Sequence, residues 1–128
     1  MVRQSLADYT TVDMQAALRP LASLITKSEK AQQKLAPGTW QHSLVQDNLR
    51  ALRIALALLV NETKGADAFT QGALKEALQA LASMMDKSRK AQAKFLPGTS
   101  QYTLLENRLK ALSIAEAIVT LAFNRADA

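Results

Sequence analysis

The sequence contains no cysteine and a single histidine, His42, and these absences exclude several kinds of chemistry. Without cysteine there are no disulfides, no thiolate nucleophiles and no thiolate metal sites. There is no Glu-x-x-His pair of the kind that di-iron bundles use. A glycine-rich phosphate loop, a nucleophile elbow and a suitably spaced carboxylate pair are also missing. We therefore expect a protein that is not an enzyme and that uses no metal and no cofactor.

Long apolar runs are missing as well. The longest one, residues 54–60, is far shorter than the roughly 20 residues that span a bilayer. Residues 1–8 lack the apolar stretch of a secretion signal. These two observations predict a soluble, cytoplasmic protein without a membrane partner.

Proline and glycine are scarce, and helix-forming alanine, leucine, glutamine and lysine dominate instead. With 48% hydrophobic residues the chain is close to the globular average, which argues against disorder and fibrous structure. The net charge of +5 gives a basic surface. Such a surface serves solubility, and it also suits nucleic acid or another polyanion.

The most informative feature that is present is an internal repeat with an offset of sixty residues. Residues 27–41 align without a gap on residues 87–101, and about two thirds of these positions are identical. An internal repeat constrains the architecture before any other argument. Gene duplication of an ancestral helical hairpin that paired as a homodimer would explain it.

Each repeat predicts two helices. Thr10 and Asp13 form the signature of a capping box before the first one, and Thr70 takes the same place in the second repeat, where Ala73 replaces the acid. Apolar residues then recur at spacings of three and four, which places them on one helix face. Pro20 predicts a kink or a late helix start in the first repeat only.

The turns at residues 36–39 and 96–99 both contain Pro-Gly-Thr. Proline stops the incoming helix, glycine permits a positive φ, and threonine caps the outgoing helix. So short a connection makes the two helices antiparallel. The outgoing helices are apolar over more than half their circumference, which predicts burial on several sides.

We therefore predict an all-α fold: a four-helix bundle built from two tandemly repeated antiparallel helical hairpins with pseudo-two-fold symmetry. Residues 1–128 form a single helical domain, with repeat one at about 9–60, a linker at about 61–68 and repeat two at about 69–124. The linker is a loop within one domain because neither hairpin can bury its apolar faces alone.

A basic stripe near the end of the first helix of each repeat is the first candidate site. Its residues are Lys27, Lys30, Lys34, Lys87, Arg89, Lys90 and Lys94. A solvated face explains such a stripe, because lysines near a helix C-terminus are favoured by the helix dipole. A partner or polyanion surface is the functional interpretation. Nucleic-acid surfaces usually add arginine and aromatic residues, whereas this stripe is mostly lysine and Trp40 occurs in one repeat only.

Polar residues inside the apolar arcs of the outgoing helices form the second candidate site. They are Asp47, Asn48, Asn107 and Arg108. A buried charge without a partner is costly, so we expect Asp47 to pair with Arg108 and Asn48 with Asn107. Such a layer either fixes the register between the hairpins or lines a pocket for a small ligand.

The large side chains of Trp40, Met84, Met85 and Phe123 could form an exposed binding surface, although methionines and aromatics at helical spacing usually belong to the core. The leading functional hypothesis is a non-enzymatic protein-interaction or regulatory module, acting through the turn-proximal surface or by self-association. Nucleic-acid or polyanion binding through the lysine stripes is the first alternative. Small-ligand binding at the polar layer is the second.

Overall fold

The computed structural model describes residues 6–60 and 69–126, and the predicted linker at 61–68 therefore lies outside the described residues. Four α-helices, preceded by the short 3-10 helix η1 (Leu6–Asp8), make up these two parts: α1 (Thr11–Gln33), α2 (Trp40–Val60), α3 (Gln71–Gln92) and α4 (Ser100–Ala126). No strand occurs in either part. The all-α prediction is thus confirmed.

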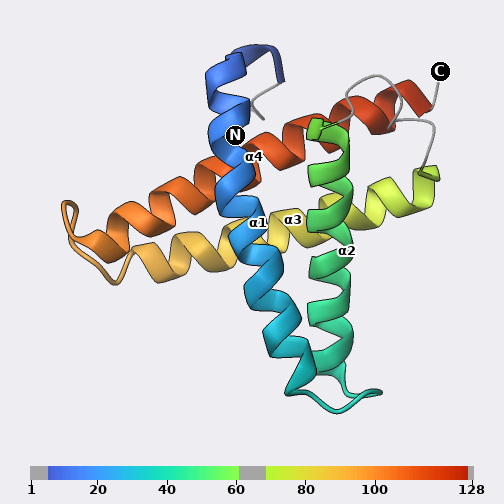
Figure 1. Cartoon of the computed structure of the whole chain (residues 1–128), viewed down its shortest axis with the longest axis horizontal. Helices are drawn as coiled ribbons and strands as arrows, with labels where there is room; N and C mark the ends of the chain where they lie inside the picture. Colours follow the sequence, from blue (N-terminus) through green and yellow to red (C-terminus); the bar gives the residue numbers. More distant parts are fainter. Residues whose placement is uncertain (1–5, 61–68, 127–128) are drawn as a thin grey trace.

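The helices associate as two antiparallel pairs, α1 with α2 and α3 with α4 (Figure 1). The pairs run across each other rather than along a common axis, and the short connection of each pair projects away from the crossing. At the crossing α1 contacts α4, and α2 contacts both α3 and α4. The molecule is a helical bundle in which each pair supplies the surface that the other buries.

Both pairs begin with the predicted threonine cap. Thr10 Oγ1 accepts the backbone N–H of Asp13 at 3.0 Å, and Asp13 Oδ2 accepts that of Thr10 at 3.0 Å, which completes a capping box. At the start of α3, Thr70 Oγ1 accepts the N–H of Ala73 at 3.1 Å. The reciprocal bond is absent there because alanine has no acceptor.

The two Pro-Gly-Thr turns have the same geometry. Gly38 and Gly98 adopt φ values of +89° and +92°, a region that favours glycine because it lacks a Cβ. Thr39 caps α2 by accepting the backbone N–H of His42 at 3.2 Å. Thr99 caps α4 in the same way, since it accepts the N–H of Tyr102 at 3.2 Å. The predicted turn and cap are therefore confirmed. The helices end at Gln33 and Gln92, before Pro37 and Pro97, so proline is not what stops them.

Pro20 lies within α1 rather than at its start, because the helix runs continuously from Thr11 to Gln33. The predicted late start is thus not observed. Ala17 and Leu21, on either side of the proline, are 2% and 0% exposed. Their burial in the core offsets the backbone hydrogen bond that proline cannot make.

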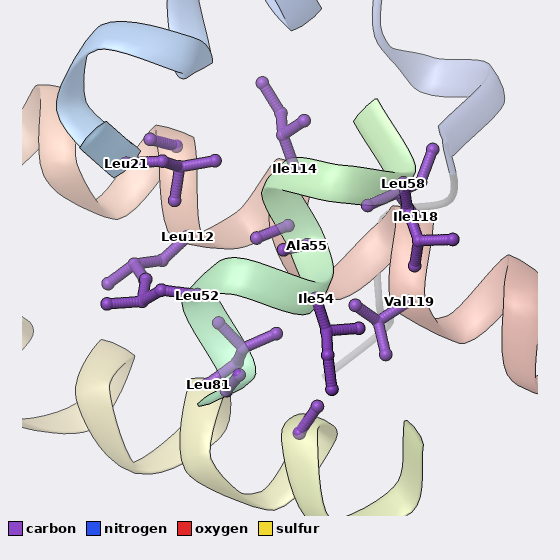
Figure 2. Packing of buried hydrophobic residues seen from close by; sticks show 14 of the residues in the cluster. Leu21, Leu52, Ile54, Ala55, Leu58, Leu81, Leu112, Ile114, Ile118 and Val119 are labelled. Carbon is purple, nitrogen blue, oxygen red and sulfur yellow. The ribbon is translucent and has the colours of Figure 1, made fainter. Parts of the chain in front are cut away.

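The core lies where the pairs cross, and all four helices contribute to it (Figure 2). Its fully buried large side chains are Leu21, Leu49, Leu52, Leu58, Leu74, Leu81, Leu112, Ile114 and Val119. Each of these contributes about 1.5–3 kcal/mol by leaving water. Small residues at the centre, Ala51 and Ala55 on α2 and Ala111 and Ala115 on α4, are at most 1% exposed. They let the backbones of the two central helices approach closely.

No helix in the described part of the chain combines the length and the apolar content that crossing a membrane requires.

Candidate functional site

The seven basic residues predicted as a surface are all exposed. Those of the first repeat lie at the end of α1 and, for Lys34, just beyond it. Those of the second lie at the end of α3 and, for Lys94, just beyond it. Among the described residues only Lys90 of the seven makes an ion pair, to Asp86 at 3.0 Å. This pair is highly exposed and is therefore worth little, so most of the positive charge is available to a partner.

The two lysine stripes do not form one surface. The connecting ends of the two pairs project in different directions from the crossing (Figure 1). We call residues 27–44 the first tip and residues 87–104 the second tip. A rigid partner can therefore contact one tip without contacting the other.

Large apolar side chains are exposed at both tips. Trp40, the first residue of α2, is 71% exposed. The second tip exposes Phe95, Leu96 and Leu104, which are 38%, 76% and 55% exposed. Water contact of this kind is unfavourable for large apolar groups unless a partner covers them.

The aromatic and methionine cluster considered from the sequence does not form one exposed surface. Met85 is 7% exposed and belongs to the core, while Met84 and Phe123 pack partly against it. Trp40 alone of the four is mainly exposed. Sequence reasoning did not select Leu96 as a surface residue. The available signal was its place directly before Pro-Gly, where the chain has left the helix and no core face is near.

The second tip is held by a network of hydrogen bonds. Thr99 Oγ1 donates to the carbonyl of Leu96 at 2.8 Å. The Gln92 amide donates to the backbone carbonyl of Tyr102 at 3.4 Å and to Glu106 Oε2 at 3.0 Å, and so connects α3 to α4. Thr39 makes the corresponding bond to Ala36 at 2.8 Å in the first tip, but in the described chain Gln32 has no bond like those of Gln92.

The predicted polar layer is divided between different grooves. Asp47 and Asn48 line an open groove of about 490 Å³ between α2 and α3. Asn107 lines a groove of about 330 Å³ between α1 and α4, and Arg108 is half-buried on α4. Within the described residues no hydrogen bond or ion pair joins Asp47 to Arg108, or Asn48 to Asn107. Ligand binding at these residues stays a prediction.

Each of these two grooves is bridged by an ion pair between the helix pairs. Arg50 on α2 lies 3.7 Å from Glu76 on α3, and Lys110 on α4 lies 3.0 Å from Asp13 on α1. The pKa of Asp13 is lowered from its ordinary value, first by the hydrogen bond from the Thr10 backbone N–H and then by Lys110. The lowered pKa favours the ionised form of Asp13, which pairs with Lys110 across the two helix pairs.

His42, the single histidine, lies near the start of α2. Its side chain is half-buried in the first turn of α2, and its backbone N–H is bound by Thr39. In residues 6–60 and 69–126 no three histidine or acidic side chains gather into a group that could hold a metal ion.

Comparison with known proteins gives no match: no family model, no curated protein and no solved structure matches the chain.

Proposed function

We propose that the protein is a non-enzymatic interaction module that presents the tips of its two helix pairs to a protein partner. The observation that supports this best is the exposure of large apolar residues beside free cations at both tips, with Trp40 71% and Leu96 76% exposed. The crossing supplies stability, and the tips contribute little to the core. They are therefore free to serve binding.

We further propose that the two pairs are copies of one hairpin related by a pseudo-two-fold axis. The residues that line the α2–α3 groove include Asp47, Arg50, Ala51, Glu76, Ala77 and Ala80. The residues sixty positions away, Asn107, Lys110, Ala111, Ala16, Ala17 and Pro20, line the α1–α4 groove. A two-fold axis that exchanges the pairs would map one groove onto the other. The division into two repeats within a single domain and the cytoplasmic location stay predictions.

A module with two related tips can bind a partner at two points. Linking two weak contacts raises the overall affinity through effective concentration, provided that the partner spans both tips. The asymmetry between the tips, tryptophan in one and leucine in the other, would then let each tip select its own segment of the partner.

Site-specific photocrosslinking in cells tests the proposed function. A photoreactive phenylalanine analogue replaces Trp40 or Leu96 in the tips, and Val12 serves as the control because it is 74% exposed but lies in the first turn of α1. We expect discrete protein adducts from position 40 or 96 and none from position 12. Equal labelling at all three positions, or no adduct at either tip, would contradict the proposal.

Polyanion binding is the second candidate function, and the six basic residues without an ion pair favour it. Neutralisation of several phosphates makes the affinity fall steeply with salt. A mobility-shift titration of duplex DNA at two salt concentrations measures this dependence. The Lys34→Glu/Lys94→Glu variant should lose binding, while Lys75→Glu, an exposed change at the other end of α3, should change it less. Absence of a shift at low salt would exclude this candidate.

A further inference from the structure

We propose that the second tip binds an acidic peptide segment that carries large apolar side chains. This inference rests on the proposed function, since it names the chemistry of the partner at one of the two tips. Three properties of the tip support it: its excess of positive charge, its apolar exposure and its fixed backbone.

The second tip has an excess of positive charge. Residues 87–104 contain four cations, Lys87, Arg89, Lys90 and Lys94. Lys90 is paired with Asp86, the residue directly before this range, at 3.0 Å, and the other three have no ion pair in the described chain. The first tip carries three lysines and Glu29, which is bound by Arg53 at 2.7 Å. A surface on which cations outnumber acids attracts a negatively charged segment and disfavours a basic one.

The second tip also exposes more large apolar residues than the first: Phe95, Leu96 and Leu104 against Trp40. Leu96 is 76% exposed, whereas Ala36 occupies the matching place in the first tip. Phe95 and Leu104 are exposed, whereas their counterparts Leu35 and Leu44 are half-buried. An acidic segment without apolar side chains would leave these groups in water. The partner therefore needs both kinds of residue.

The backbone of the second tip is fixed before binding. Thr99 closes the turn onto the Leu96 carbonyl, and Gln92 connects α3 to Tyr102 and Glu106 on α4. A fixed turn loses little conformational entropy when a partner covers it. Leu96 is therefore presented as an anchor at low entropic cost.

A groove of about 550 Å³ leads from the second tip toward η1, and Arg89 and Gln92 are among the residues that line it. Glu106 and Lys110, which also line it, are bound to Gln92 and Asp13. Arg89 is the cation of this groove that has no ion pair in the described chain. A carboxylate of the peptide can form a bidentate pair with its guanidinium.

The second tip suits a peptide better than a single-stranded nucleic acid. Binding to unpaired bases depends on aromatic faces on which the bases stack. The two most exposed apolar residues here, Leu96 and Leu104, are aliphatic. These two side chains offer no stacking face, and Phe95, the aromatic residue of the tip, is less exposed than either of them, at 38%.

Fluorescence anisotropy with the full-length protein tests the proposal. The probe is a labelled peptide in which Glu and Asp alternate with Leu and Phe at helical spacing, and its control replaces Leu and Phe by Ser. We expect the first peptide to bind at least about tenfold more tightly than the second, because burial of apolar groups supplies that difference. A single-stranded oligothymidylate of matched charge is the third probe.

The internal repeat supplies matched variants. Leu96→Ala copies the residue of the first tip, and Trp40→Ser copies Ser100. Leu96→Ala should lower the affinity for the acidic apolar peptide about tenfold. Lys94→Glu should lower the same affinity and make it less dependent on salt concentration. Trp40→Ser should leave the affinity unchanged. Circular dichroism of each variant checks that the fold is retained.

Three results would overturn the inference: equal binding of the two peptides, tighter binding of the oligothymidylate, or no effect of Leu96→Ala. Self-association in sedimentation that Leu96→Ala abolishes would also overturn it, because it assigns the tip to a second copy of the chain. If these tests fail while position 96 still crosslinks to a protein in cells, the proposed function stands and only the acidic chemistry is wrong. If the peptide-binding tests fail and position 96 gives no crosslink either, both the acidic-peptide inference and the proposed function of this tip are wrong.

Discussion

Asp13 forms an ion pair with Lys110, a residue 97 positions away in the chain: the ammonium of Lys110 lies 3.0 Å from Oδ1 of Asp13. Oδ2 of the same carboxylate accepts the backbone N–H of Thr10. One side chain thus caps α1 and joins the two helix pairs at their crossing. It couples a local signal of the sequence to the tertiary structure.

The first prediction concerns acid stability. The pKa of Asp13 in the folded protein lies below its ordinary value of 3.8, so the carboxylate stabilises the fold above that pH. This contribution is lost as the pH falls through the folded-state pKa. Urea unfolding of the wild type and Asp13→Asn should differ at neutral pH and converge below pH 3.8. Lys110→Met removes the hydrogen bond from Lys110 but keeps the one from Thr10, so it should lower the stability at neutral pH by less than Asp13→Asn does. A difference in stability between the wild type and Asp13→Asn that grows as the pH falls would contradict this role of Asp13.

The second prediction restores the missing half of a capping box. Ala73→Asp places a carboxylate where Asp13 stands in the first repeat, within reach of the Thr70 N–H. We expect stabilisation by about 0.5 kcal/mol, measured by thermal unfolding, since the acid also favours the helix N-terminus. Ala73→Asn is the uncharged control and should give less. Destabilisation by aspartate would mean that the packing of Ala73 against the core outweighs the cap.

The third prediction concerns the crossing. Leu52 and Leu112 are both 0% exposed and occupy equivalent places in the two repeats. Replacing either by alanine should lower the free energy of unfolding by about 2–5 kcal/mol, because a cavity remains in a packed core. Leu104→Ala, at a side chain that is 55% exposed, should change it by less than about 0.5 kcal/mol. Similar losses at all three positions would contradict the described core.

The fourth prediction concerns the glycines, at which backbone strain and steric clash have separable effects on stability. A Cβ at Gly38, Gly72 or Gly98 would meet nothing within 4 Å, but only Gly38 and Gly98 have a positive φ. Gly98→Ala should therefore cost about 1 kcal/mol through the left-handed backbone alone. Gly72→Ala should stabilise α3 by up to about 1 kcal/mol, because glycine weakens a helix. Chemical unfolding of both variants checks the signs, and a gain at Gly98 would exclude the turn geometry.

Local features of the fold could be predicted because neighbouring residues determine them. Thr10 and Asp13 bond each other whatever surrounds them, and the glycine of Pro-Gly-Thr takes a positive φ in both turns. The exposure of the lysine stripes was predictable for a similar reason, since solvation of the charge keeps each ammonium in water. Trp40 is different. Its size favours burial, but its place at the start of α2, directly after the turn, leaves it outside the core.

The polar layer shows what periodicity could not provide. Asp47 and Arg108 both lie on the apolar arcs of a helical wheel, but the two helix pairs cross (Figure 1). Asp47 lines the groove between α2 and α3, whereas Asn107 lines two grooves on α4, one beside α3 and one beside α1. A wheel gives the direction of a side chain around one axis, but not the angle between two axes.

The sequence by itself determined the helices, their caps, the two turns and the sixty-residue relation between the halves, because each depends on contacts within a few residues. The tertiary structure decided how the pairs cross, which polar groups meet, and that Leu96 and Trp40 remain in water at separate tips. These outcomes depend on the packing of side chains that are distant in the chain. Small residues at 51, 55, 111 and 115 permit close approach, but only the assembled core selects the direction of the crossing.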